Sequence, residues 1–395
     1  MFSIGIFTYS TKPRGSVVHA THLAEALLRR GHDVTLYALS KAGDTLYRDV
    51  ACPVRYLSAA QAPTQPDALI RQRVSEVAAG LSALAPRHDI YHAEDCLVAS
   101  GLLAKRAELK LKPLVRTLHH LEHFVSPYLR DCQRRSILEA DAVACVSRVS
   151  QRDVQLELGR ACPIIGNGVD VERFAADEQL AEQTRARFGL TSNERVVLSV
   201  GGVEPRKNSF CALEAMVPVL RARPDVRWLI AGGDSIWEHD AYRAAFRDRL
   251  SKLEPALRAR IVELGPVAER ELTGLYGISQ ILLCPSLQEG FGLCVLEALA
   301  AGSAVVVSAA EPFTEYLTPA VASFVQPASP ASIAEGVAGL LDDEARRGQL
   351  ARAGQQHARA FAWREIAVEH ERLYARTLFR ASRRWIVPHE EPAHA

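Results

Sequence analysis

Short apolar runs alternate with helical patterns through both halves of the chain, and this alternation constrains the fold most. In the first half, the run 4–9 precedes a turn-rich loop, a helical pattern over 19–30 and a second run at 33–39. In the second half, the run 196–200 begins the same alternation. Strand–loop–helix–strand order predicts parallel strands with right-handed crossovers. Because 395 residues suffice for two cores, we predict two facing α/β domains with a cleft between them.

The composition argues against several classes of protein. A formal net charge of +1 gives no reason to expect a nucleic acid partner. No run of about 18 apolar residues is present, so no transmembrane segment is expected, and the N-terminus lacks the pattern of a signal peptide. Eight cysteines without a Cys-x-x-Cys pair argue against a zinc site and are typical of buried thiols in a cytoplasmic protein.

The segment from Pro285 to Gly302 joins a glycine loop to a short helix. An apolar strand end stops at Pro285, and a helical pattern follows the loop and ends at Gly302. Glycines let backbone N–H groups approach a ligand closely, and the first turn of a helix favours an anion. We therefore predict an anion site formed by Gly290, Phe291, Gly292 and Leu293.

Two carboxylates, Glu289 and Glu297, lie at either end of this predicted anion site with seven residues between them. Eight residues of helix rise about 12 Å, so the two side chains would contact different parts of a long ligand. Carboxylates accept hydrogen bonds from diols, and one at each end of a diphosphate suits a nucleotide sugar. The alternative is an acid at a helix start and a solvated acid on the helix surface. The position of the pair, in a glycine loop after a strand, favours the ligand interpretation.

At these residues the chain resembles glycosyltransferase family 4, the group 1 glycosyl transferases, which are retaining enzymes of the GT-B fold. Two glutamates separated by seven residues, a Gly-Phe-Gly and a small-residue helix carry the resemblance, which extends over about residues 1–380. It implies two Rossmann-like, doubly wound domains. The first, on the acceptor side, is expected over 1–175 together with a C-terminal helix of about 361–385, and the second, which binds the donor, over 190–360. It also implies no cofactor and no metal, since the Asp-x-Asp metal motif of the other major glycosyltransferase fold is absent.

In the first domain, Gly15 and Ser16 resemble the family's first glycine loop, which usually has two glycines followed by a histidine. The resemblance implies that both bind the donor and that His19 lies on the acceptor side. The alternative is a plain strand-to-helix turn. His119 ends an apolar run that resembles the family's Thr-x-His, which implies contact with the donor sugar or the acceptor. Strand-end histidines are otherwise more often merely solvated.

In the second domain, Arg206 and Lys207 follow the run 196–200 and a glycine pair. A guanidinium and an ammonium at a strand end suit a diphosphate. The alternative interpretation of this pair is an exposed basic turn. The family usually has Gly-Arg where this chain has Gly201-Gly202, so Arg206 is predicted to supply the missing cation. The resemblance also places the backbone of Val267 along the nucleobase.

The predicted function is metal-independent, retaining transfer of a hexose-type sugar from a nucleoside-diphosphate sugar to an unknown acceptor hydroxyl. The catalytic residues would be Glu289, His119, Arg206 and Lys207. Two alternatives stay open: a non-catalytic nucleotide-sugar-binding protein, and a sugar-nucleotide epimerase of the GT-B fold. A nicotinamide oxidoreductase is disfavoured because no strand-end Gly-x-Gly-x-x-Gly occurs.

The first domain also has a group of basic residues, which we interpret either as a peripheral membrane contact or as a solvated face. Its members are Lys105, Arg106, Lys110, Lys112 and Arg116.

Overall fold

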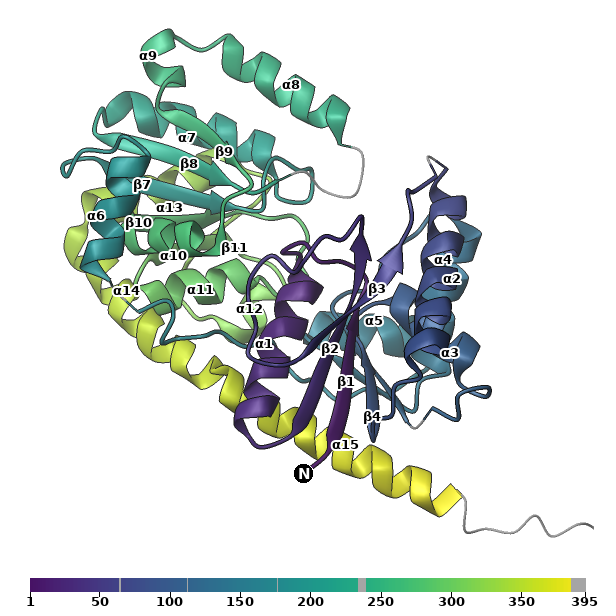
Figure 1. The fold of residues 1–395 in the computed structure, drawn as a ribbon. Coiled ribbons are helices and arrows are strands. Elements are labelled where there is room, and N and C mark those ends of the chain that lie inside the picture. The colour runs from purple at the N-terminus through teal and green to yellow at the C-terminus, as the bar shows by residue number, and fades with distance from the viewer. Residues whose placement is uncertain (64, 112, 176, 234–238, 385–395) are drawn as a thin grey trace, which may run out of the picture. The chain divides into compact units, whose positions relative to one another are not determined.

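The computed structural model describes residues 1–63, 65–111, 113–175, 177–233 and 239–384. The chain divides into two compact units. Unit 1 consists of Met1–Asn167 and Trp363–Ala395, and unit 2 is Gly168–Ala362. Figure 1 shows the elements of each unit and their order along the chain.

Unit 1 is built on a parallel six-stranded sheet of order β3-β2-β1-β4-β5-β6. Its strands are β1 (Ser3–Thr8), β2 (Asp33–Lys41), β3 (Val54–Ala59), β4 (Ile90–Ala93), β5 (Leu114–Leu118) and β6 (Ala142–Cys145). Its helices are α1 (Gly15–Arg29), α2 (Pro66–Leu84), α3 (Cys96–Lys105), α4 (Pro127–Leu138), α5 (Arg148–Leu158) and α15 (Trp363–Arg384).

Helices cover both faces of this sheet, which is why its central strands β1, β4 and β5 are almost entirely buried. Helices α1 and α15 pack together on one face, whereas α2, α3 and α4 stack on the other (Figure 1). In β1, Ile4 and Ile6 belong to the core beneath α1 and α15, and Phe7 belongs to the core on the opposite face. The alternation of side chains along a strand explains this division.

Unit 2 repeats the design with a parallel sheet of order β12-β11-β10-β7-β8-β9. Its strands are β7 (Arg195–Val200), β8 (Val226–Ala231), β9 (Ile261–Gly265), β10 (Ser279–Cys284), β11 (Ala304–Ser308) and β12 (Ser323–Val325). Its longer helices are α6 (Glu178–Arg187), α7 (Ser209–Ala222), α8 (Asp240–Ser251), α10 (Glu269–Ile278), α11 (Leu293–Ala301), α13 (Pro330–Asp342) and α14 (Glu344–Ala358). The short ones are α9 (Pro255–Arg258), α12 (Phe313–Tyr316) and the 3-10 turn η1 (Arg359–Phe361).

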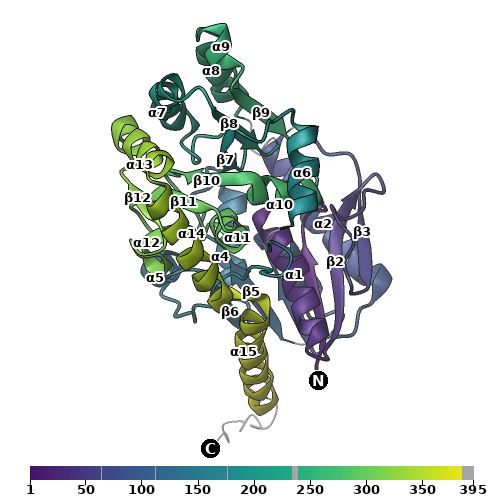
Figure 2. The same ribbon diagram turned by 90° about the vertical axis from the view of Figure 1, so that its left-hand side faces the viewer.

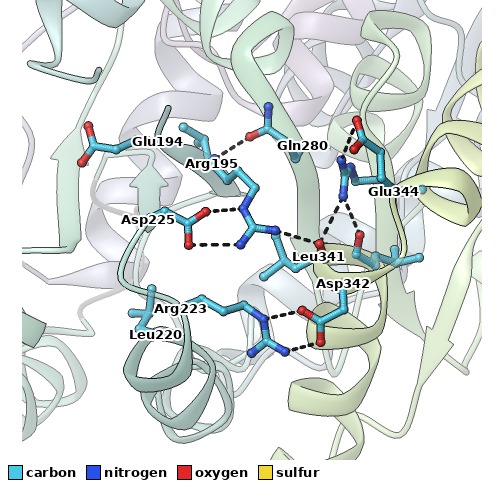
Figure 3. Close-up of polar contacts among 12 residues, drawn as sticks. Glu194, Arg195, Leu220, Arg223, Asp225, Gln280, Leu341, Asp342 and Glu344 are labelled. Atoms are coloured by element: carbon cyan, nitrogen blue, oxygen red, sulfur yellow. Dashed lines mark hydrogen bonds and ion pairs between the residues drawn. The ribbon is translucent and has the colours of Figure 1, made fainter. Parts of the chain in front are cut away.

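Helices α7 and α13 pack on one face of this sheet (Figure 2) over a core that includes Met216, Trp228 and Val306. At the amino-terminal edge of the sheet a polar cluster joins several of its elements (Figure 3). Arg195 donates to both carboxylate oxygens of Asp225, at 2.5 and 3.1 Å, and to the carbonyl oxygen of Leu341 at 2.7 Å. This cluster ties the start of β7 to the end of α13, away from the carboxyl ends of the strands.

Strand order in both sheets reverses direction once, between β1 and β4 in unit 1 and between β7 and β10 in unit 2. This is the doubly wound arrangement, and the predicted pair of Rossmann-like domains is confirmed. In such sheets ligands bind outside the carboxyl ends of the strands at the reversal point. The two places to search for a site are therefore the loops after β1 and β4 and the loops after β7 and β10.

Several local predictions differ from the structure. Helix α1 begins at Gly15, not at His19, so Gly15 and Ser16 form its first turn. The gap between the expected domains 1–175 and 190–360 contains α6. Strands β3 and β12 were not predicted, because they are edge strands whose sequences have weak apolar alternation. No helix in the described residues combines the length and apolar character needed to cross a bilayer.

Candidate functional site

The loops that follow β7 and β10 are bound to each other in unit 2. The backbone N–H of Leu287 donates to the carbonyl oxygen of Arg206 at 2.8 Å. Asn208 adopts a left-handed conformation at φ +61°, and its Nδ2 donates to the carbonyl oxygens of Pro285 (3.0 Å) and Pro327 (2.6 Å). The reversal point of the sheet is therefore a fixed structure rather than two independent loops.

Glu289 is the centre of the charged group on these loops. Its carboxylate accepts from Lys207 Nζ at 2.5 Å and from Ser286 Oγ at 2.9 Å, and it lies 3.5 Å from Arg206 Nη1. Arg206 is also paired with Glu204 at 2.8 Å. Only 8% of the Glu289 side chain and 13% of the Lys207 side chain are exposed, against 47% for Arg206. The structure thus brings together three residues predicted from separate segments, and Arg206 is the one that faces solvent.

Burial and charge oppose each other in this group. Burial alone would raise the pKa of Glu289, but Lys207 and Arg206 outweigh it and hold that pKa below its ordinary value. Burial alone would lower the pKa of Lys207, but the charge of Glu289 outweighs it and raises that pKa. Both groups are therefore charged at neutral pH, so the site presents preformed charges to an incoming anion.

Gly202 stands where the family usually has arginine, and its backbone explains the difference. It adopts φ +75°, and a Cβ atom there would lie 2.9 Å from the carbonyl oxygen of Gly233. A side chain at this position would be strained and would press on the adjacent loop. In this chain the exposed cation on the β7 loop is Arg206, which approaches from four residues further along.

The loop before α11 is held rigidly around its glycine. Gly292 caps the helix at φ +94°, and a Cβ atom there would lie 2.5 Å from the ring of Phe313. The ring of Phe291 stacks on Tyr316 with centroids 4.6 Å apart, and the Tyr316 hydroxyl donates to the Phe291 carbonyl oxygen at 3.0 Å. Since the first N–H groups of a helix have no partner within it, the start of α11 at Leu293 is suited to bind an anion.

Glu297 lies one turn further along α11 and has a different environment. Its carboxylate accepts from the hydroxyl of Tyr276 at 2.7 Å. Burial raises the pKa of Glu297, and the hydrogen bond from Tyr276 only partly offsets this. Glu289 and Glu297 are thus distinct: the first is paired directly with cations, whereas the second accepts a hydrogen bond from a phenol.

A pocket of about 300 Å³ opens beside the β7 loop. It is lined by the backbone of Gly202, Gly232 and Gly233, by Pro266, and by the charged side chains of Arg247 and Glu263. Val267, predicted to lie along a nucleobase, is half-buried in the next loop, between β9 and α10. It follows the lining residue Pro266 directly but does not itself line the pocket.

At the reversal point of unit 1 the central residue is Glu94, which follows β4. Its carboxylate accepts from His19 Nδ1 at 3.1 Å and from His119 Nε2 at 2.9 Å, and His92 Nε2 lies 3.6 Å away. Glu94, His19 and His92 are fully buried, whereas 15% of the His119 side chain is exposed. His19 and His119, predicted from separate motifs, therefore meet on a residue that was not predicted. The sequence signal was available, because the run 89–93 ends in Glu94-Asp95.

Burial dominates the electrostatics of these histidines. It lowers the pKa of His119 and of His92 to about 4, although Glu94 acts in the opposite direction on both. Burial would raise the pKa of Glu94, but His19 and the hydrogen bond from His119 outweigh it and hold that pKa well below the ordinary value. Glu94 is therefore an ionised carboxylate surrounded by imidazoles.

Helix α15 completes this cluster from the far end of the chain. The ring of Trp363 contacts that of His19 edge-on, with centroids 5.2 Å apart. The Tyr374 hydroxyl lies 2.6 Å from His92 Nδ1, and the His370 ring stacks on that of His92. These contacts pack α15 against His19 and His92, two of the histidines that contact Glu94.

The ligand atoms of His19, Glu94 and His119 all lie within 4.8 Å of one another, close enough to be considered as a metal site. Metal-bound histidines almost always donate their second ring N–H to an acceptor. His19 Nε2 is buried and has no hydrogen-bond partner in the described residues. The cluster therefore fits a metal ion poorly and fits an ion-pair network well.

The predicted basic face of the first domain is incomplete. Arg116 is not on the surface: it lies in β5 with 5% exposure, and its guanidinium bonds to backbone carbonyl oxygens of its own strand and of β4. Lys105 is paired with Glu108 at 2.6 Å, and Arg106 with Asp141 at 2.6 Å. Lys112 lies outside the described residues. Including Arg116 in the basic group was wrong under either interpretation, because it lies in an interior strand of a sheet that helices cover on both faces.

Comparison with known proteins agrees with this geometry. A family model described as "Glycosyl transferases group 1" matches residues 181–357, and one described as "Glycosyltransferase Family 4" matches 13–173. The chain is 27% identical over 287 residues to a D-inositol 3-phosphate glycosyltransferase of Corynebacterium glutamicum, and this match spans 66% of each chain. A protein of the same name from Corynebacterium diphtheriae is 26% identical over 396 residues, or 91% of this chain and 89% of that one.

Solved structures show the same fold at lower identity. Sucrose-phosphate synthase from Thermosynechococcus elongatus superposes with a TM-score of 0.76 at 21% identity and covers 96% of this chain and 100% of that chain. Anabaena HepE in complex with UDP and glucose superposes with a TM-score of 0.76 at 20% identity, covering 95% of this chain and 100% of that chain.

Proposed function

The chain belongs to the group 1 glycosyl transferases, family 4, and on that premise we propose that it transfers a sugar from a nucleoside-diphosphate sugar to an acceptor hydroxyl, with retention of configuration and without a metal ion. The observation that carries this proposal is the charged group on the β7 and β10 loops. Arg206, Lys207 and the start of α11 are positive features at the one edge of the sheet where a doubly wound fold binds its ligand.

In the proposed reaction the bond between the anomeric carbon and the diphosphate oxygen breaks, and its electron pair stays on the diphosphate. Arg206, Lys207 and the N–H groups from Gly290 to Leu293 stabilise that charge. Preorganised donors of this kind are worth roughly 3–4 kcal/mol each in the barrier. They take the place that a divalent cation would otherwise have at the leaving group.

The acceptor oxygen bonds to the anomeric carbon on the face that the diphosphate leaves, and its proton passes to an oxygen of the departing phosphate. Glu289 positions the sugar and balances the positive charge that develops near it. Glu297 accepts hydrogen bonds from the ribose hydroxyls, and His119 contacts the sugar or the acceptor. Gly15, Ser16 and His19 belong to the same proposal: the first turn of α1 contacts the donor and His19 lies toward the acceptor.

The comparisons suggest the first substrates to test. HepE was solved with UDP and glucose, so UDP-hexoses are sensible donors, and a relative named as GDP-mannose-dependent adds GDP-mannose. Relatives named as D-inositol 3-phosphate glycosyltransferases make phosphorylated polyols sensible acceptors. The match to the first of these spans 66% of its length, just under two thirds, so neither its donor nor its acceptor is carried over as established.

The test is a donor–acceptor panel with two readouts, nucleoside diphosphate release and mass of the product. We expect release that depends on an acceptor, a glycosylated product with the donor's anomeric configuration, and undiminished rates in EDTA. Binding without release would favour the non-catalytic alternative, and an isomerised donor without an acceptor would favour the epimerase. Activity that requires added Mg²⁺ or Mn²⁺ would contradict the metal-independent mechanism.

A further inference from the structure

We propose that Glu94 is a positioning residue that holds His119 in one ring tautomer, with the proton on Nε2 and a bare Nδ1 that accepts a hydrogen bond from a substrate hydroxyl. This inference deepens the proposed function and rests on it, because it assigns His119 a chemical role toward the sugar or acceptor. It concerns a residue, Glu94, that neither the sequence motifs nor the comparisons assign.

Hydrogen-bond chemistry fixes the direction of the contact. A carboxylate without a proton has only acceptors, so the 2.9 Å contact between Glu94 and His119 Nε2 requires a proton on that nitrogen. In a neutral imidazole the other nitrogen must then be an acceptor. The lowered pKa of Glu94 and the pKa of about 4 of His119 are consistent with these two charge states at neutral pH.

The surroundings leave Nδ1 as the substrate-facing atom. His119 is the one histidine bonded to Glu94 with an exposed portion, 15% of its side chain, whereas His19 is fully buried. Nδ1 of His119 has no hydrogen bond to any part of the chain that the structure describes. An acceptor nitrogen at the reversal point of the unit 1 sheet suits a sugar hydroxyl, which donates one hydrogen bond.

The contacts of Glu94 explain why a carboxylate, rather than an amide, suits the task of fixing the His119 tautomer. The imidazoles of His19, His92 and His119 contact Glu94, and α15 encloses the cluster through Trp363 and Tyr374. A neutral amide in this position could turn its NH₂ group toward His119 and select the other tautomer. An ionised carboxylate has acceptors at both oxygens, so whichever way it turns it accepts from His19 and His119.

The first test measures the tautomer without activity. In histidine-selective ¹⁵N-labelled protein, two-bond nitrogen–proton correlations at pH 7.5 report which ring nitrogen carries the proton, and the His119→Ala variant assigns the signal. We expect His119 protonated on Nε2 in the wild type and a mixed or reversed pattern in Glu94→Gln. Protonation on Nδ1 in the wild type would overturn the proposal, whatever the enzyme's substrates prove to be.

The second test is kinetic and uses Tyr374→Phe as the matched control, because it removes one buried hydrogen bond from the same cluster without touching Glu94 or His119. We expect Glu94→Gln to lower kcat about 100-fold, a typical size for one positioned acid–base group, with the donor KM changed less than about threefold. Tyr374→Phe should keep kcat within about twofold.

A double-mutant cycle separates positioning from structural damage. If Glu94 acts through His119, the variant Glu94→Gln/His119→Ala is no slower than His119→Ala alone. An equal further loss in the His119→Ala background, or an equal loss in Tyr374→Phe, would overturn the proposal. So would stoichiometric Zn²⁺ binding that activates the enzyme and disappears in His119→Ala. If no donor–acceptor pair reacts with the wild type, the proposed function fails while the tautomer measurement still decides this inference.

Discussion

At the scale of single residues, the two reversal points use charge in opposite ways. In unit 2 one carboxylate, Glu289, holds the cations Lys207 and Arg206 ready for an anion. In unit 1 one carboxylate, Glu94, holds the imidazoles of His19 and His119 in fixed orientations. Both carboxylates are buried, and burying either charge without its partners would lower the stability of the fold.

Replacing Glu289 by glutamine tests the first arrangement. The amide keeps the shape but removes the charge that holds Lys207, so we expect transfer to fall at least ~100-fold, the order expected for the loss of one preorganised electrostatic contact. Initial rates of nucleoside diphosphate release measure this. Asp225→Asn is the matched control, because it removes a paired carboxylate at the opposite edge of the same sheet. Equal losses in both variants would contradict a local role for Glu289.

The buried histidines predict acid sensitivity. Burial lowers the pKa of His370 to about 3 and that of His92 and His119 to about 4, against about 6.5 in the unfolded chain. Between about pH 6.5 and pH 4 the unfolded chain therefore binds protons that the folded chain does not, and the free energy of unfolding falls as the pH falls. Asp95 and Glu297 oppose this in acid, because burial raises the pKa of Asp95 to about 6 and also raises that of Glu297, but they are two groups against three histidines.

The variant His370→Leu measures how much one histidine contributes to the pH dependence of the free energy of unfolding. His370 Nδ1 contacts only a carbonyl oxygen of its own helix, and Nε2 has no partner in the described residues, so a leucine of similar size should be tolerated. We expect the dependence of the unfolding free energy on pH to weaken by about 1.4 kcal/mol per pH unit between pH 6 and pH 4. Urea denaturation at several pH values gives this slope, and an unchanged slope would contradict the assignment.

At the scale of elements, the turn from β7 into α7 determines the shape of the donor site. Asn208 directly precedes α7 in the left-handed region and makes no side-chain capping hydrogen bond; instead its amide donates to the carbonyl oxygens of Pro285 and Pro327. The side chains that precede it, Arg206 and Lys207, are thereby aimed at the loop after β10. A single asparagine thus serves both as the turn residue and as the link to two neighbouring loops.

Two variants separate these roles. Asn208→Gly keeps the backbone conformation but removes the amide donor from the carbonyl oxygens of Pro285 and Pro327, of which the second keeps a contact with Cys211 Sγ at 3.2 Å. We therefore expect a loss of about 1–3 kcal/mol in the free energy of unfolding. Asn208→Ala loses the same amide and keeps a Cβ atom at φ +61°, a strain that glycine relieves, so we expect it to be about 1 kcal/mol less stable than the glycine variant. Urea denaturation ranks the variants, and a glycine variant as stable as the wild type would show that the amide bridge is dispensable.

At the scale of the whole molecule, each unit has its own sheet and its own core. A ligand that binds one unit should therefore stabilise that unit above all. At 100 times its dissociation constant, a nucleoside diphosphate should add about 2.7 kcal/mol to the unit that binds it. Hydrogen exchange in moderate urea can distinguish the units: we expect added UDP or GDP to protect peptides from β7 and β10 more than those from β1 and β4. Preferential protection of β1 and β4 would place the nucleotide in unit 1 and contradict the donor assignment.

The sequence by itself predicted two α/β domains with parallel strands and placed Glu289, Arg206, Lys207 and His119 at the ends of apolar runs, and the doubly wound order was what the family resemblance implied. It could do so because apolar alternation, glycines and helix starts are local patterns. The tertiary structure alone decided that His19 and His119 meet on Glu94, which is 75 and 25 residues away from them along the chain. It also decided that Gly202 cannot carry the family's arginine, because that depends on the approach of Gly233 from the next strand. Buried polar pairs and close backbone contacts are set by which strands become neighbours, and no local pattern records that.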